Sequence, residues 1–162
     1  EKNMTISINV NIFKKNIFIL NIALKYPPFD VRLKKIAEKT YIFDGVRKKW
    51  LVLTPEEWVR QHVINYLIVF IKISTSSISL EKEFNLNGIK KRYDIVVFDK
   101  QLKPTIIIEC KAPYVELNTE VLEQALRYNL IIKSKLLMIT NGVSDLVFDK
   151  NNRITKLNPF LE

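Results

Sequence analysis

The strongest constraint on the fold of this chain is the dipeptide Asn87-Gly88, which separates two runs rich in strand-forming residues. Asn-Gly in such a position is the strongest short-range signal for a two-residue β-hairpin, because both residues tolerate positive φ. The flanking runs, residues 80–86 and 89–98, are therefore predicted to be antiparallel strands. A loop of six residues leads to a third predicted strand over residues 105–111, so this part of the chain predicts a three-strand meander.

A helix is predicted before this meander, after two short strands at residues 41–44 and 50–53. Thr54 is a favourable N-cap, Pro55 suits the first helical position, and Glu57 stands three residues after the cap, as in a capping box. The helix should run to about residue 70 and carry an apolar stripe at helical spacing. This stripe consists of Val59, Val63, Tyr66, Leu67 and Phe70.

Helices and strands continue to alternate after the meander. Asn118 or Thr119 can cap a second helix that extends to about residue 133, and the continuous apolar run at residues 136–140 is typical of a strand buried on both faces. A final hairpin over residues 143–157 should turn at residues 149–152. The order helix, three strands, helix and strand predicts an α/β fold.

The N-terminal part is predicted to be an extension of the main domain. Apolar residues alternate strictly over residues 5–12, as in a half-buried strand, and a turn at residues 14–16 leads to a second strand. The stiff connector Tyr26-Pro27-Pro28 favours a division into a hairpin extension, 1–25, and a main domain, 26–162. An exposed edge in the extension would favour a homodimer through these strands.

Composition excludes several kinds of site. The 162 residues include one cysteine, Cys110, one histidine, His62, and three glycines. These numbers exclude a disulfide scaffold, a cysteine-rich zinc site, and the glycine-rich loops of P-loop and Rossmann proteins. Chemistry is therefore expected on carboxylates and lysine, whereas His62 and Cys110 are expected to be packed residues.

The formal net charge of +9 favours a polyanionic partner such as DNA, although abundant Ile, Lys and Asn could also reflect A+T-rich coding. The most apolar N-terminal stretch, residues 17–24, is too short to span a bilayer, and it lacks a cleavage site of the signal-peptide type. These features predict a cytoplasmic protein with no membrane partner.

Two carboxylates are predicted to meet on neighbouring strands of the meander. Glu109 and Lys111 are two residues apart on the third strand and so share a face. Symmetric closure of the preceding loop pairs Phe98 with Thr105, and therefore Asp94 with Glu109. The Cβ atoms of such neighbours lie about 5 Å apart, and like charges there are destabilising unless a cation such as Mg²⁺ offsets them. A surface sheet with incidental ion pairs is the alternative, but Ile- and Val-rich strands make such charges costly.

These residues resemble a known signature. Asp94, followed after a hairpin by Glu109-Cys110-Lys111, resembles the D…E-x-K signature of the PD-(D/E)xK nuclease superfamily. The element order is similar to the core of that superfamily, which implies a restriction-endonuclease-like fold with a mixed central sheet. Five segments look like the N-terminal nuclease domain of the type I restriction enzyme R subunit. They are residues 26–29 (YPPF), 54–62 (TPEEWVRQH), 91–97 (KRYDIVV), 109–113 (ECKAP) and 140–142 (TNG).

The resemblance implies a role for each signature residue. Asp94 and Glu109 would ligate Mg²⁺ or Mn²⁺, with the Cys110 carbonyl as a further ligand, and Lys111 would orient or help deprotonate the attacking water. Tyr93 stands where the nominal signature has proline, a change that removes no ligand.

Residues from both helices join the site in the resembling nucleases. Glu56 and Glu57 compete for the role of a further glutamate from the first helix. Glu57 already has a place in the capping box, whereas Glu56 lies seven residues before Val63 and shares the inward stripe, so Glu56 is preferred. Gln124 and Tyr128, four apart on the second helix, match the Q-x-x-x-Y element that helps position the active site in helicase-associated members, although simple packing would also explain the tyrosine.

The function implied is a Mg²⁺-dependent DNA endonuclease of restriction-modification type, with separately encoded restriction subunits as candidate partners. Lys90, Lys91 and Arg92, which are close in sequence to the site, and Arg127 are expected to contact DNA. One alternative is a catalytically silent nuclease-fold module that binds DNA or a restriction-complex partner. Another is a structure-specific resolvase that acts as a dimer on branched DNA.

Overall fold

The computed structural model describes residues 22–86, 88–123, 126, 134–155 and 157. Its elements are β1 (Leu33–Ile36), β2 (Lys39–Asp44), β3 (Lys49–Val52), α1 (Pro55–Val69), η2 (Thr75–Ser77), β4 (Ile78–Leu86), β5 (Ile89–Phe98), β6 (Pro104–Cys110), β7 (Leu136–Thr140) and β8 (Asp145–Asp149). Residues 119–123 and 126, between β6 and β7, are helical as well. No helix among the described residues has the length and apolar character that a membrane span requires.

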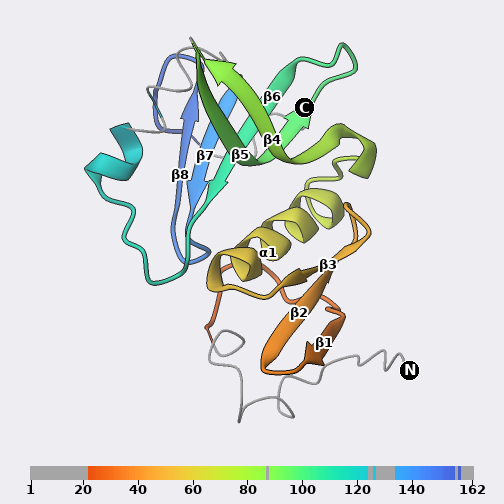
Figure 1. The fold of residues 1–162 in the computed structure, drawn as a ribbon. Helices are drawn as coiled ribbons and strands as arrows, with labels where there is room; N and C mark the ends of the chain where they lie inside the picture. The colour runs from red at the N-terminus through yellow and green to blue at the C-terminus, as the bar shows by residue number, and fades with distance from the viewer. Residues whose placement is uncertain (1–21, 87, 124–125, 127–133, 156, 158–162) are drawn as a thin grey trace.

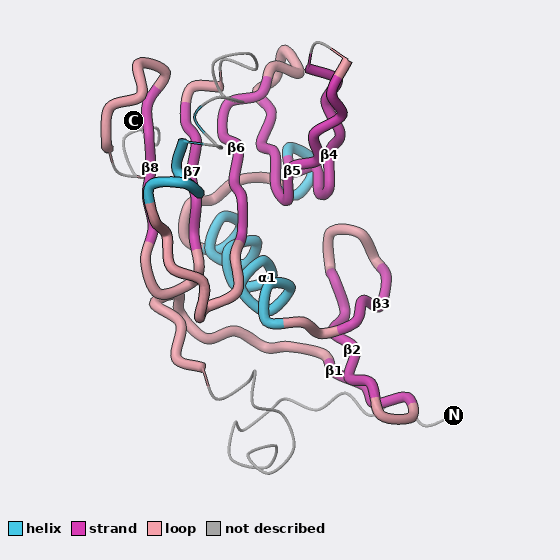
Figure 2. The backbone as a smooth tube through the Cα atoms, turned by 60° about the vertical axis from the view of Figure 1, so that its left-hand side comes forward, coloured by secondary structure: helices cyan, strands magenta, loops and turns pink. Residues whose placement is uncertain are grey.

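Two sheets lie on opposite sides of α1 (Figure 1). The larger sheet has the order β4-β5-β6-β7-β8, in which β6 and β7 are parallel and the other neighbours antiparallel. The smaller sheet, β1-β2-β3, is antiparallel throughout, and Figure 2 shows it on the side of α1 away from β7 and β8. This mixed α/β architecture confirms the predicted fold class. The strand β1 was not predicted.

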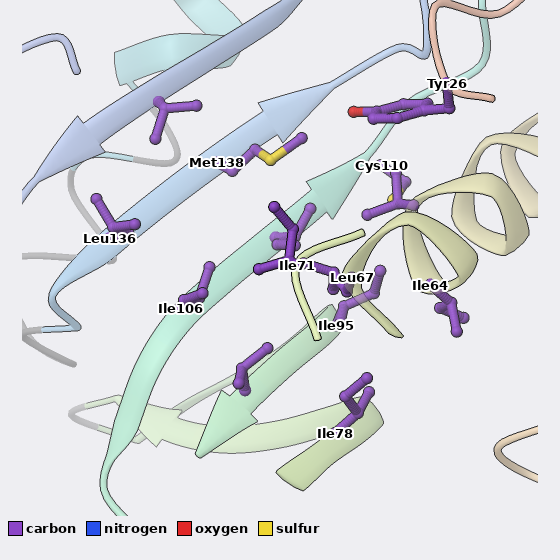
Figure 3. Packing of buried hydrophobic residues seen from close by; sticks show 14 of the residues in the cluster. Tyr26, Ile64, Leu67, Ile71, Ile78, Ile95, Ile106, Cys110, Leu136 and Met138 are labelled. Atoms are coloured by element: carbon purple, nitrogen blue, oxygen red, sulfur yellow. The ribbon is translucent and has the colours of Figure 1, made fainter. Parts of the chain in front are cut away.

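The buried face of α1 packs against the larger sheet. Val59, Val63 and Leu67 are fully buried, at the spacing that the sequence predicts. Figure 3 shows Leu67 beside Ile95 of β5, in the cluster that also contains residues of β6 and β7. Apolar packing of the later turns of α1 therefore places its first turn beside the five-stranded sheet.

The end of the helix differs from the prediction. Phe70 was expected on the apolar stripe, but α1 ends at Val69 and Phe70 is its C-cap, with 48% of its surface exposed. The chain leaves the helix there, so Phe70 stacks on the partly buried Tyr66 at a ring distance of 5.6 Å. The next residue, Ile71, enters the core in its place.

The other face of the larger sheet is covered by the helical segment between β6 and β7. The side-chain carbonyl of Asn118 accepts the backbone N–H of Val121 at 3.1 Å, which identifies Asn118 as the N-cap of the two predicted candidates. Leu122 and Leu126 pack on the cluster that contains Ile107. The central strands are thus buried on both faces, and all five residues of β7 are buried, as predicted.

The predicted hairpins agree with the described residues. Gly88 has φ +84° at the turn between β4 and β5, which pair antiparallel. After β8, the backbone N–H of Asn152 bonds to the Asp149 carbonyl at 2.9 Å, and Phe148 forms a bridge with Ile154. The final turn therefore lies where the sequence places it.

The predicted N-terminal hairpin at residues 1–25 lies almost entirely outside the described residues, and its division from the main domain stays a prediction. Lys25 donates its backbone N–H to the Gly142 carbonyl at 2.8 Å. Leu24 lies so close to Gly142 that a Cβ there would be 2.7 Å from its side chain, and Gly142 has φ +82°. The glycine in the segment TNG is therefore explained by close packing and backbone conformation.

Candidate active site

The two predicted carboxylates come from neighbouring strands. The β5–β6 ladder pairs Val96 with Ile107 and Ile95 with Ile108, which is the predicted register and makes Asp94 and Glu109 next in line. The backbone N–H of Cys110 donates to Asp94 Oδ2 at 2.6 Å, so Asp94 lies against the end of β6.

One predicted pair in the same ladder is wrong. Phe98 pairs with Pro104 and not with Thr105, because a bulge shifts the register between Val97 and Phe98. The bulge is at the loop end of the hairpin. Next to it, the Thr105 hydroxyl donates to the Val97 carbonyl at 3.0 Å. The register beyond Val97, toward the carboxylates, is therefore unaffected.

Arg60 of α1 lies at the centre of the site. Its Nη2 donates to Asp94 Oδ1 at 2.6 Å and to Glu56 Oε1 at 3.3 Å, and its Nη1 donates to Glu57 Oε2. Burial lowers the pKa of Arg60, but the charges of Asp94 and Glu57 outweigh burial and raise that pKa above its ordinary value. Arg60 is therefore a permanent positive charge that joins the first turns of α1 to β5.

Lys111 follows the last residue of β6, where the prediction had extended the strand to include it. Its Nζ lies 3.3 Å from Glu109 Oε1, and its backbone N–H donates to the Thr140 carbonyl at 2.8 Å. The backbone bond fixes Lys111 at the end of β7, while its side chain is 29% exposed. An amine held in this way remains reachable from solvent.

Glu56 lies within electrostatic range of Asp94, Arg60, Glu109 and Lys111. Burial raises the pKa of the Glu56 carboxyl, and the charge of Asp94 raises it further. The cations Arg60 and Lys111 oppose this rise, and Glu109 adds to it. Glu56 is 45% exposed, so it faces both the cluster and solvent.

Glu57 belongs to a different network. Its Oε1 accepts from Gln61 Nε2 at 2.8 Å and from Arg47 Nη2 at 3.1 Å, and both donors also contact Asp44, a buried residue of β2. Its backbone N–H bonds to Thr54 Oγ1 at 3.0 Å, which is the cap half of the predicted capping box. The Glu57 carboxylate therefore links α1 to the smaller sheet.

The donor chemistry at this site suits a hard divalent cation, because Asp94, Glu109 and Glu56 offer carboxylate oxygens. Their arrangement is not a formed ligand set: among the residues that the structure describes, no three His, Cys, Asp or Glu side chains converge as metal ligands. The cation at Asp94 Oδ1 is Arg60. The Cys110 side chain is fully buried in the core, as predicted, so only its backbone can contribute.

Three predicted site residues, Gln124, Arg127 and Tyr128, lie outside the described residues. The predicted DNA contacts on β5 are only partly defined. Lys90 is exposed and its Nζ lies 3.3 Å from Glu83 Oε1, and Arg92 is exposed. For Lys91 only the backbone is described. These positions fit a surface role and do not test it.

Arg60 was not among the predicted site residues. Its signal was present, because Arg60 follows Glu56 by four residues and Glu57 by three, and side chains at both spacings meet on a helix surface. What the sequence could not reveal is the contact with Asp94, thirty-four residues away.

Comparison with known proteins matches the part of the chain that begins at α1. Residues 55–160 match a family model described as type I restriction enzyme R protein N terminus (HSDR_N). A solved structure that also matches is the fragment of a protein assigned as an HsdR subunit of a type I restriction enzyme from Vibrio vulnificus YJ016, at 23% sequence identity and a TM-score of 0.41. That match covers 51% of this chain and 18% of the other chain. A search of curated proteins gave no match.

Proposed function

This chain belongs to the family of type I restriction enzyme R protein N-terminal domains, and we propose that it is a nuclease, a Mg²⁺-dependent DNA endonuclease that hydrolyses phosphodiester bonds with activated water. The observation that carries the proposal is the meeting of an Asp94 carboxylate and the Glu109–Lys111 pair at the end of β6. Glu56 supports it as a third carboxylate within electrostatic range.

Asp94 and Glu109, with the Cys110 carbonyl, are the groups that would hold the metal ion. Mg²⁺ bound there would supply Lewis-acid stabilisation of negative charge on the phosphate. Glu56 would be a further acidic group facing the same place from α1, in preference to Glu57, whose carboxylate is engaged by Arg47, Arg60 and Gln61.

The chain's own residues contribute orientation and charge. The Cys110 N–H fixes one oxygen of Asp94, and Glu109 holds the amine of Lys111. From this position Lys111 would orient the attacking water and stabilise the charge that develops on the phosphate. Gln124 and Tyr128 would help to position these groups, and Lys90, Lys91, Arg92 and Arg127 would contact the DNA backbone.

DNA is the proposed substrate, and other restriction subunits, separately encoded, are proposed partners. The formal net charge of +9 supports the first part, because cations that neutralise phosphates release counterions and gain affinity. The family name supports the second, since it describes one terminus of a restriction enzyme subunit. A cytoplasmic location, and a homodimer through residues 1–25, belong to the same proposal.

One observation favours a second candidate, a nuclease-fold module that binds DNA or a restriction subunit without cutting. Asp94 Oδ1 is already occupied by Arg60, at a distance of 2.6 Å. An ion pair of this kind must be rearranged before that oxygen can ligate a metal ion. If the pair persists when metal is added, the domain would bind and not cut.

The experiment that separates the two candidates follows nicking of supercoiled plasmid DNA with Mg²⁺, Mn²⁺ or EDTA. The native chain is compared with Asp94→Asn, which keeps the shape of the side chain, and with Lys103→Ala, which alters an exposed lysine in the loop before β6. Metal-dependent nicking that is lost in Asp94→Asn and kept in Lys103→Ala is expected. Retention of DNA in a gel-shift assay without any nicking would reject the endonuclease and favour the binding module. Preference for branched over linear DNA would indicate a resolvase.

A further inference from the structure

The side of the smaller sheet that faces away from α1 is basic and aromatic. We name it the outer face and define it by Arg32, Lys34, Lys39, Tyr41, Phe43 and Trp50. The register pairs Lys34 with Tyr41 and Phe43 with Trp50, so these side chains lie together on one side. The intervening residues Leu33 and Ile42 are buried against Trp58 of α1 on the other side.

Two cations lie over two neighbouring rings on this face. The Arg32 guanidinium lies 3.5 Å from the centre of the Phe43 ring, and the Lys34 Nζ lies 4.5 Å from the Trp50 ring. Phe43 and Trp50 meet edge to face at 5.2 Å. The four side chains thus form a continuous row in which each cation lies over an aromatic ring.

None of the six residues that define the outer face, all of which the structure describes, is acidic. The acidic residues of the sheet are directed elsewhere. Asp44 is fully buried on the inner side with Arg47, and Glu38, in the turn after β1, lies 3.7 Å from Lys35. The cations of the outer face therefore have rings and solvent as partners and keep their charge available to a polyanion.

We propose that the outer face binds single-stranded DNA. The proposal goes beyond the endonuclease function, because the face contains no residue of the candidate active site and lies before residue 55, where the family match begins. Proteins that bind single strands without reading sequence combine backbone-tracking cations with rings on which bases stack. The outer face provides both on three short strands and on Arg32, the residue before β1.

The contacts explain how both parts of a single strand would be engaged. The Arg32 guanidinium lies over the Phe43 ring and belongs to an exposed residue, and its planar group can itself stack on a base. The flexible Lys34 side chain can leave the Trp50 ring to a base and move to the neighbouring phosphate. Duplex DNA would offer only phosphates to this face, since its bases are stacked on one another, and so would leave the rings unused.

Binding is tested by fluorescence anisotropy of a fluorescein-labelled dT20 oligonucleotide in EDTA, where no metal-dependent cutting occurs. We expect Trp50→Ala to weaken binding about tenfold, within the range of stacking losses known for single-strand binders, and Trp50→Phe to keep most of it. Lys34→Glu should weaken binding further and flatten the dependence on salt. Lys103→Glu, the same charge reversal on an exposed lysine outside the smaller sheet, should have a much smaller effect. Thermal melting by circular dichroism checks that each variant is folded.

Three results would overturn the proposal: no binding of dT20 to the native chain at low salt, equal affinities of native, Trp50→Ala and Lys34→Glu chains, or equal affinity for a duplex of the same length. Should Trp50→Ala fail to fold, the comparison of Lys34→Glu with Lys103→Glu decides alone. If the native chain binds dT20 in this way but never nicks plasmid DNA, only the endonuclease proposal is rejected. If it nicks plasmid DNA but the outer-face variants bind dT20 like the native chain, only the present proposal is rejected.

Discussion

Two clusters of acids and cations flank the first turns of α1, and they differ in how far water reaches them. The sealed cluster consists of Asp44, Arg47, Glu57 and Gln61, and the open cluster consists of Glu56, Asp94, Glu109 and Lys111. In the sealed cluster the Asp44 side chain is wholly buried and that of Glu57 is 7% exposed. In the open cluster Lys111 is 29% and Glu56 45% exposed.

The difference shows how adjacent glutamates acquire different roles. Glu57 shares its oxygens among Arg47, Arg60 and Gln61, so its negative charge is matched within the fold. Burial raises the pKa of both glutamates, so the difference lies in their contacts: Glu56 has one long contact, to Arg60 at 3.3 Å, and the nearby charge of Asp94 raises its pKa further. Buried charge that is fully matched stabilises structure, whereas partly matched charge facing solvent is available to a ligand.

The largest effect is expected from a substitution that disrupts the sealed cluster. Asp44→Ala removes the acceptor of Arg47, of Gln61 and of two backbone N–H groups, and leaves the nearly buried Arg47 with one carboxylate fewer. Breaking a buried pair by removing one partner costs about 3–5 kcal/mol. We expect the free energy of unfolding, measured in urea, to fall by this amount. Glu38→Ala, in the turn after β1, is the control, and an Asp44→Ala chain as stable as that control would show that the cluster contributes little.

The next largest effect is expected from a substitution that disrupts the open cluster, and this prediction rests on the proposed function. Lys111→Ala removes the amine beside Glu109, and loss of one group that stabilises charge in a transition state costs about 10²–10³ in rate. We expect plasmid nicking to fall by this factor, while the free energy of unfolding changes by at most about 1 kcal/mol, because the Glu109–Lys111 pair is partly exposed. Unchanged nicking would remove Lys111 from the mechanism. A loss of stability like that of Asp44→Ala would place it in the structure instead.

Local signals in the sequence predicted most of the fold. The cap at Thr54, the turn at Gly88 and the apolar run of β7 each depend on neighbours in the chain, and each is found where it was predicted. The errors occurred where the local signal in the sequence was weak. Phe70 leaves the stripe because the chain turns there, and β1 is a short strand that exists through pairing with β2.

The candidate site was predictable in part for the same reason. The pairing of Val96 with Ile107 follows from the loop length, and it brings Asp94 toward Glu109. Arg60 was missed because its partner Asp94 is on another element, and nothing local distinguishes an arginine that binds a site carboxylate from one in solvent. A bulge is equally hard to foresee, and it shifted Phe98 to Pro104.

A smaller effect is expected at Arg60, which connects the two clusters. Arg60→Gln removes charged hydrogen bonds to Asp94 and Glu57, and such bonds contribute about 1.5–3 kcal/mol each. Glu57 keeps Arg47 and Gln61 as donors and Asp94 keeps the Cys110 N–H, so we expect a total loss of stability toward the lower end of the range for one bond. We also expect tighter Mn²⁺ binding by isothermal titration calorimetry, because Asp94 Oδ1 is released. Arg92→Gln, an exposed arginine of β5, is the control. Weaker Mn²⁺ binding in Arg60→Gln would instead mean that Arg60 holds Asp94 in the orientation that the metal needs.

The smallest effect concerns the charge of Glu56 and its dependence on pH. Because burial and Asp94 raise the pKa of Glu56 above its ordinary 4.5, the folded chain binds more protons than the unfolded chain from about that pH upward. Stability therefore falls as pH rises through the window between the unfolded and folded pKa values. Glu56→Gln has no such charge, so it should match the native chain below pH 4.5 and exceed its stability above the window by less than about 1 kcal/mol, since Glu56 is 45% exposed and screened by solvent. Urea unfolding from pH 4 to 8, with Glu38→Gln as the control for losing a surface carboxylate, measures this difference. A Glu56→Gln chain that is less stable than the native chain at pH 7 would show that the pair with Arg60 outweighs burial, and Glu56 would then belong with the sealed cluster.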